Sequence, residues 1–258
     1  MHPHTSHGAE VIPVRWTNLK WMMLSPAHMK HYAEKPVALS TAMRVGAMTH
    51  SLVLGGSRTF AVYHGIRRGK EWEAFLASAT ENGDEVISEN EAAVAKTCAD
   101  ALLADSLAVS LLDGDREQTV KWVQNGILCQ GTPDVVGPHG TVELKVTDMP
   151  PQRLPWHARR MGWLGQLAWY ESGLDFKDVS VWLYIVTVSP KPPHLVTSYM
   201  LTDAAHEAGT RLAVSLWERF KTCHESGVWG GYGEGLQIID APDDEDVTLT
   251  IGGEEIEL

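Results

Sequence analysis

The chain is organised around one stretch, Thr132-Pro-Asp-Val-Val-Gly-Pro-His-Gly-Thr-Val-Glu-Leu-Lys145. Its second half, with the Val-Thr that follows, is rich in β-branched residues and predicts a strand. Because residues two apart share one face of a strand, Glu143 and Lys145 point the same way and Leu144 points to the other side. The Gly-Pro-His-Gly turn folds Asp134 back beside them. Two carboxylates and an ammonium group would then converge, which is enough to hold a hard divalent cation and activate a water.

A competing interpretation is structural, since a Glu-x-Lys pair on a strand is commonly a solvated edge with a cross-strand charge pair. Two details favour chemistry. Asp134 follows Pro133 within an otherwise apolar region, and Leu144 and Val146 lie opposite the charges, so the strand presents one apolar and one charged face. A buried charged cluster requires mutual pairing or a metal ion, and carboxylate oxygens suit Mg²⁺ or Mn²⁺.

Length and composition limit the classes to which the protein could belong. A chain of 258 residues with 44% hydrophobic residues is long enough for one domain with a sizeable core. We find no apolar run of about 18 residues and no secretory signal at the start of the sequence. The three scattered cysteines predict buried free thiols in a reducing compartment. We therefore expect a cytoplasmic protein that does not bind a membrane.

The net charge of −12 argues at first against a polyanionic partner. Eight acidic residues and no Lys or Arg lie in 240–258, however, and without them the charge is about −4. A basic groove is compatible with that remainder. The acidic tail has three interpretations: a solvated disordered end, a mimic of DNA that occupies the groove, or a docking segment for a partner. The alternating run Val247–Ile251 could instead form a strand that adds to a sheet edge.

Periodicity and turn signals predict the order of elements. Helices are predicted over 16–31 with a break at Ser25-Pro26, and over 40–55, 70–79, 88–103, 106–112, 156–172 and 204–225. Strands are predicted over 60–63, 117–124, 127–136, 141–147, 179–189 and 195–201, and Asn125-Gly126 is a hairpin signal. This order indicates an α/β (α+β) fold, in which a central mixed β-sheet contains an antiparallel meander and is flanked by helices. We expect a disordered segment 1–12, a single domain 13–239 (a helical part 13–115 and a core 116–239) and the tail 240–258.

At this point the chain resembles a known family. Three motifs match the PD-(D/E)XK nucleases of the RecB-like branch: Gly131-Thr-Pro-Asp134 with Glu143-Leu-Lys145, Gln166-x-x-x-Tyr170, and Gly46-x-x-x-His50. Their order is similar to that of the RecE-type phage exonucleases, the exodeoxyribonuclease VIII group, over roughly 25–201. The resemblance implies a restriction-endonuclease-like core. Iron–sulfur cysteines, seen in some RecB-like nucleases, and a nucleotide-binding motif are both missing from this sequence.

The resemblance also implies roles for individual residues. The implied metal ligands are His50, Asp134, Glu143, the Leu144 carbonyl and, for a second ion, Glu117; Lys145 is the implied catalytic lysine. Gln166 and Tyr170 would order the site or contact the DNA backbone. Against these roles, His50 could be a core histidine, although it lies on the small-residue face of its helix, and Tyr170 could be packing. Candidate phosphate contacts are Arg67, Arg68, Lys70, Arg153, Arg159 and Arg160.

The function that the sequence predicts is an Mg²⁺- or Mn²⁺-dependent deoxyribonuclease that digests linear double-stranded DNA from its ends. By resemblance, it would leave single strands for phage-type recombination, form a ring-like homo-oligomer, work with a single-strand annealing protein and, if phage-encoded, act in the host cytoplasm. One alternative is an endonuclease or single-strand-specific nuclease on the same core. The other is a catalytically silent DNA- or protein-binding module.

Overall fold

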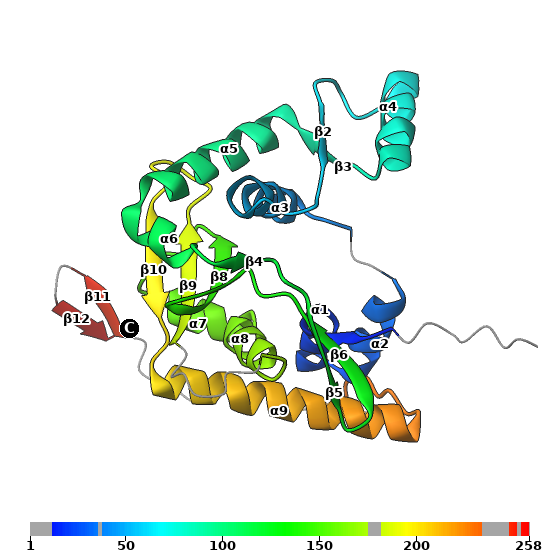
Figure 1. The fold of residues 1–258 in the computed structure, drawn as a ribbon, viewed down its shortest axis with the longest axis vertical. Helices are drawn as coiled ribbons and strands as arrows, with labels where there is room; N and C mark the ends of the chain where they lie inside the picture. Colours follow the sequence, from blue (N-terminus) through cyan, green and yellow to red (C-terminus); the bar gives the residue numbers. More distant parts are fainter. Residues whose placement is uncertain (1–11, 36–37, 175–181, 234–247, 252–253, 258) are drawn as a thin grey trace, which may run out of the picture.

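The computed structural model describes residues 12–35, 38–174, 182–233, 248–251 and 254–257 (Figure 1). The N-terminal part contains β1 (Val14–Arg15), α1 (Trp16–Leu19), the 3₁₀ turn η1 (Lys20–Met23), α2 (Pro26–Glu34), α3 (Thr41–Leu54), β2 (Phe60–Tyr63), α4 (Gly69–Asn82), β3 (Glu85–Ser88), α5 (Glu89–Ala104) and α6 (Ser106–Leu111). There follow β4 (Asp115–Arg116), β5 (Val120–Gln124), β6 (Ile127–Gly131), β7 (Val135–Gly137), β8 (Gly140–Val146), α7 (Leu154–Arg160), α8 (Trp163–Glu171), β9 (Trp182–Val188), β10 (Val196–Met200) and α9 (Asp203–Ser226).

The central sheet has five strands in the order β10-β9-β8-β7-β4. Strands β8 and β9 run parallel, and the other neighbours are antiparallel, so the predicted mixed sheet flanked by helices is confirmed. Strand β8, which carries Glu143 and Lys145, is the middle strand. It therefore has a hydrogen-bonded neighbour on each side, which makes it a rigid support for a site.

The two faces of β8 meet different helical layers. Leu144 and its register partner Val186 are fully buried in one cluster, with apolar residues of α3, α5 and α6. Ile185, the partner of Glu143, belongs to a second cluster that includes Leu167 of α8. The alternation of side chains along a strand thus directs Glu143 and Lys145 to the α8 side of the sheet, as the sequence predicts.

A second sheet corrects the predicted meander. The segment 127–136 is not one strand: β6 pairs with β5 and, in parallel, with β1, whereas β7 joins the central sheet. The chain leaves the first sheet at Thr132 and Pro133, because proline has no N–H to donate to a continuing ladder. Asp134 therefore lies where the chain crosses from one sheet to the other.

The helix predicted over 156–172 also divides, into α7 and α8. Gly162 separates them with a φ of 73°, a left-handed conformation that ends one helix and begins the next. This break gives α8 its own direction, along α9. Their shared core with the β1-β6-β5 sheet includes Trp169, Trp217 and Phe220, whose rings pack in series, tilted to one another, with centroids 5.8 and 5.4 Å apart.

Most other expected elements agree with the structure. Ser25 and Ser88 cap α2 and α5, and Ser88 forms a capping box with Glu91. In the tail, β11 (Thr248–Ile251) pairs with β12 (Glu254–Glu257) rather than with an edge of the central sheet. The predictions for 1–11 and 240–247 fall outside the described residues. None of the helices in the described part of the chain is long and apolar enough to cross a membrane.

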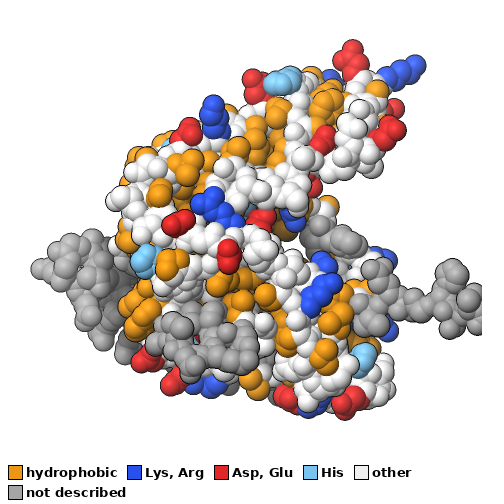
Figure 2. Space-filling model, in the orientation of Figure 1, with side chains coloured by type: hydrophobic (Ala, Val, Ile, Leu, Met, Phe, Trp, Pro, Cys, Tyr) orange, Lys and Arg blue, Asp and Glu red, His pale blue; other side chains and the backbone are white. Residues whose placement is uncertain are grey.

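The elements form two parts on either side of the central sheet (Figure 1). One part contains α3, α4, α5 and the β2–β3 pair, and the other contains α1, α2, α9 and the β5–β6 hairpin. The space-filling view shows that the surface is hollowed between them (Figure 2). The site strand β8 lies at the base of this arrangement, with α3 on one side and α8 on the other.

Candidate active site

A cavity of about 830 Å³ brings together the residues that the sequence motifs single out. Its lining contains five of the implied metal-site and catalytic side chains: His50, Glu117, Asp134, Glu143 and Lys145. Gln166 and Tyr170 line it as well. Residues separated by more than a hundred positions in the chain therefore share one cavity, because α3, the β6–β7 crossing, β8 and α8 all end or pass there.

Asp134 is held by the backbone of the site strand. Its Oδ2 accepts a hydrogen bond of 2.7 Å from the N–H of Leu144, and its Oδ1 lies 3.5 Å from Nδ1 of His50. Its own carbonyl accepts from the N–H of Glu117 at 3.0 Å. A backbone N–H of β8 thus holds the buried Asp134 carboxylate, whose other oxygen faces His50 of α3. His50 also lines the cavity.

Glu143 and Lys145 form an ion pair that α8 holds in place. Nζ of Lys145 lies 2.5 Å from Oε1 of Glu143, and the Gln166 amide donates to the same oxygen at 2.5 Å. The carbonyl oxygen of that amide accepts from Lys145 at 3.3 Å, and its nitrogen also donates to the Tyr170 hydroxyl at 2.7 Å. Gln166 therefore fixes both charged groups at once, and Tyr170 fixes Gln166.

The electrostatics of the site reflect several charges in a buried space. Burial and the neighbouring negative charge of Asp134 raise the pKa of Glu143 to about 7, although Lys145 opposes this shift. Burial would also raise the pKa of Asp134, but the charges of His50 and Lys145 and the hydrogen bonds from His50 and Leu144 lower it. For His50, burial lowers the pKa and the adjacent Asp134 more than restores it, so the pKa of His50 is raised.

The donor atoms fit a divalent cation. Oε2 of Glu143 is buried and has no hydrogen-bond partner in the described residues, which is costly for a carboxylate oxygen unless a cation or water satisfies it. Asp134 supplies a second carboxylate, the type of oxygen donor that suits Mg²⁺ and Mn²⁺, and the imidazole of His50 adds a nitrogen donor beside it. Within the described ranges, no three His, Cys, Asp or Glu side chains are arranged as a complete metal-binding group. The ligand set, including the Leu144 carbonyl, stays a prediction.

Glu117, the implied ligand of a second ion, lies on the rim of the same cavity. Its backbone has a φ of 48°, an uncommon left-handed conformation for a residue with a side chain. The carboxylate reaches the backbone at Gly56, where an added Cβ would overlap it. This contact joins the β4–β5 connection to the loop after α3.

The predicted phosphate contacts lie outside the cavity. Arg68 and Lys70 are exposed at the start of α4, and Arg153, Arg159 and Arg160 are exposed on or beside α7. Arg160 stacks on the exposed Trp156 at 5.2 Å. A contact between these five residues and DNA stays a prediction.

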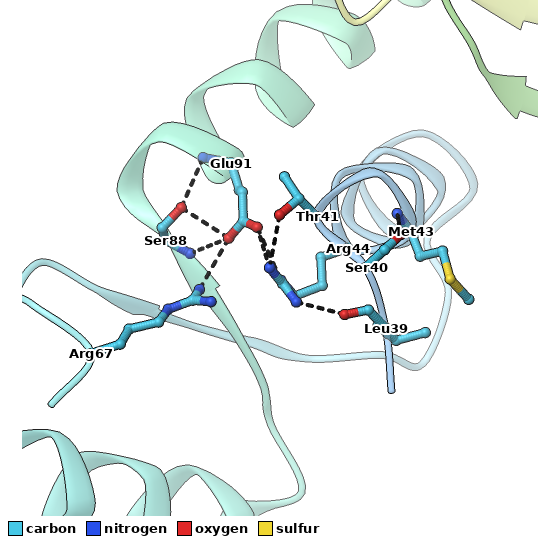
Figure 3. Close-up of polar contacts among 8 residues, drawn as sticks. All are labelled: Leu39, Ser40, Thr41, Met43, Arg44, Arg67, Ser88 and Glu91. Carbon is cyan, nitrogen blue, oxygen red and sulfur yellow. Dashed lines mark hydrogen bonds and ion pairs between the residues drawn. The ribbon is translucent and has the colours of Figure 1, made fainter. Parts of the chain in front are cut away.

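Arg67 has an ion-pair partner within the protein (Figure 3), and its contact with DNA also stays a prediction. It lies 3.0 Å from Oε2 of the buried Glu91, whose other oxygen receives Arg44 from α3. The same carboxylate binds the N–H and hydroxyl of Ser88 at the start of α5. Glu91 therefore ties α3, which carries His50, to α5 and to the segment before α4.

Sequence reasoning missed other residues beside the site. Arg15 and Arg58 line the cavity, as do Gln130 and Thr132. Lys20 lies near Lys145. Burial and, to a smaller extent, the repulsion between the two ammonium groups lower the pKa of Lys20. No local pattern marks these residues, since they stand singly in turns or at strand ends. Only the motif-like Thr132-Pro133-Asp134 could have indicated one of them, Thr132.

The sequence over 16–242 matches a protein family described as "PDDEXK-like domain of unknown function (DUF3799)". The chain belongs to this PDDEXK-like family. Pro133 and the three cavity residues Asp134, Glu143 and Lys145 are the residues to which the family name refers. No curated protein matches the chain.

The PDDEXK-like fold is also found in a solved structure. A crystal structure of a "putative exonuclease" from Eubacterium rectale is similar to this chain with a TM-score of 0.61 and 14% sequence identity. The similarity covers 89% of this chain and 90% of that one. At this identity the two proteins share the fold, which spans nearly the whole of both chains.

Proposed function

We propose that this PDDEXK-like protein is a divalent-metal-dependent deoxyribonuclease, using Mg²⁺ or Mn²⁺, and that it digests linear duplex DNA from its ends. The observation that carries the proposal is the cluster of the buried Asp134 and Glu143 with the half-buried Lys145, in which one carboxylate oxygen of Glu143 has no hydrogen-bond partner among the described residues. The membership of the family supports nuclease chemistry. The similarity to a protein described as an exonuclease favours action on ends.

In this proposal the chain's own residues prepare the hydrolysis of a phosphodiester. Asp134, Glu143 and His50 would hold the cation, which would supply positive charge beside the phosphate and lower the pKa of the attacking water. The reaction forms a bond from the water oxygen to phosphorus and breaks one ester bond, whose oxygen leaves with a proton. Lys145, fixed by Gln166, would orient the water and offset the negative charge that develops on the phosphate.

Electrostatic pairing explains why the lysine is positioned so tightly. Lys145 shares an oxygen of Glu143 with Gln166, so its ammonium group is held beside the cavity instead of extending into solvent. A preorganised charge needs no rearrangement as the reaction proceeds, which is how such groups lower a barrier. Tyr170 and Gln166 therefore act as positioning residues here. A role in recombination, a ring-shaped homo-oligomer and an annealing partner stay predictions from the resemblance.

The test uses the full chain with Mg²⁺ and three substrates of one sequence: duplexes labelled at the 5′ or the 3′ end, and a covalently closed circle. We expect loss of label from linear duplexes and an intact circle, with Asp134→Asn inactive in the same preparation. Cleavage of the circle would show that the protein is an endonuclease and does not need a DNA end. Absence of cleavage of every substrate, with either Mg²⁺ or Mn²⁺, would overturn the proposed function.

A further inference from the structure

Two arginines on the cavity wall have no role in the cluster just described. Arg15 and Arg58 line the same cavity as Asp134 and Glu143, and both are exposed. Within the described residues, neither guanidinium forms an ion pair with a carboxylate; Arg15 has only a 3.4 Å hydrogen bond to the side chain of Gln130. Lys145, the third cation of the lining, is already paired with Glu143.

Arg15 is fixed to the strand that delivers Asp134. It lies in β1, which pairs in parallel with β6, and its register partner is Gln130. From Gln130 the chain passes directly through Thr132 to Asp134. The position of Arg15 is therefore set by backbone pairing, which is more rigid than the position of a cation in a loop.

Arg58 is fixed to the helix that carries His50. The Ser51 hydroxyl donates to the carbonyl of Arg58 at 2.9 Å and approaches that of Gly56 at 3.3 Å. The loop between α3 and β2 is thereby folded back on the end of α3. Arg58 belongs to the part with α3 and β2, whereas Arg15 belongs to the part with α1 and β6, so the two cations come from opposite sides of the hollow (Figures 1 and 2).

We propose that Arg15 and Arg58 form a two-sided clamp that binds the DNA phosphates flanking the scissile one. The clamp deepens the proposed function and rests on it. A site that contains three carboxylates repels a phosphate backbone, and two guanidinium groups that have no carboxylate partner among the described residues would offset this repulsion where the strand enters and leaves. Guanidinium also matches phosphate oxygens with two parallel hydrogen bonds, which a lysine cannot do.

The salt dependence of DNA binding tests the clamp without any cleavage. Anisotropy of a labelled blunt duplex is measured with EDTA over a series of NaCl concentrations, for wild type, Arg15→Ala, Arg58→Ala and the double variant. Each single variant should reduce the slope of log affinity against log salt by about 1, and the double variant by about 2. Arg219→Ala, an exposed arginine on α9 outside the cavity, should leave the slope unchanged.

Arg15→Lys separates charge from geometry. The salt slope of this variant should equal that of wild type because the charge is kept, but its DNA affinity should be about tenfold lower because lysine cannot form two parallel hydrogen bonds to phosphate. Unchanged slopes in Arg15→Ala and Arg58→Ala, alongside a wild type that cleaves DNA, would overturn the clamp and leave the nuclease intact. A wild type that neither binds nor cleaves DNA would overturn both. Because both side chains are exposed, all variants should unfold at the wild-type temperature.

Discussion

Replacing Glu91 with Gln should remove a pH-dependent part of the protein's stability. Glu91 is 5% exposed and receives Arg44, Arg67 and Ser88, as Figure 3 shows. Burial alone would raise the pKa of Glu91, but hydrogen bonds from Arg44 and Ser88 and the charge of Arg44 lower it from 4.5 to about 2.

The magnitude follows from that shift. Each unit of pKa is worth about 1.4 kcal/mol, so the charged form of Glu91 contributes on the order of 3 kcal/mol to the free energy of unfolding. Because the pKa of Glu91 is lower in the folded protein, this contribution is complete above the unfolded pKa of 4.5 and is lost as the pH falls towards 2. At about pH 3.5, roughly 1.4 kcal/mol should already be gone.

Urea unfolding of wild type and Glu91→Gln at about pH 7 and about pH 3.5 measures this contribution of Glu91 to the free energy of unfolding. The difference between them should shrink by more than about 1 kcal/mol on acidification. Glu89→Gln is the matched control, since Glu89 lies in the same helical turn but its side chain is 74% exposed and pairs with His64 at the surface. A difference in unfolding free energy between wild type and Glu91→Gln that does not change with pH would show that the charged form of Glu91 does not stabilise the fold.

Two further substitutions probe the core and the site. Trp217→Ala should lower the free energy of unfolding in urea by about 3–5 kcal/mol, because it empties a position that is 2% exposed and removes a hydrogen bond to Asn125. Trp217→Phe should cost less. A loss under about 1 kcal/mol for Trp217→Ala would contradict the packing described. Gln166→Leu removes the amide that holds Glu143 and Lys145, so the single-turnover cleavage rate should fall by about a hundredfold at unchanged DNA affinity, whereas an unchanged rate would contradict the positioning role.

Periodicity was sufficient for the site strand because the apolar Val142, Leu144 and Val146 alternate with Thr141, Glu143 and Lys145, although β8 is buried on both faces up to Leu144. Two boundaries were missed although signals for them exist. Pro133 could not continue a ladder, and Gly162 stands inside a helical pattern. Both errors came from giving the apolar pattern more weight than the residue that interrupts it.

The rest depends on long-range contacts that no local pattern encodes. Arg67 has the same local appearance as Arg68, but a carboxylate 24 residues away, on Glu91, binds it in the fold. Arg15 and Arg58 are isolated cations, and only the pairing of β1 with β6 and the folding of the loop after α3 bring them to the cavity. Motifs could thus predict the acid–lysine centre, and the fold was needed to predict its surroundings.

We predict that Lys145 acts in catalysis at a site where Asp134 and Glu143 bind the metal ion. Lys145→Ala separates these two parts in one preparation, by calorimetric titration with Mn²⁺ and by digestion of end-labelled linear duplex with Mg²⁺. We predict that Lys145→Ala still binds Mn²⁺ and loses digestion by at least about a hundredfold. Digestion at the wild-type rate by Lys145→Ala would contradict the claim.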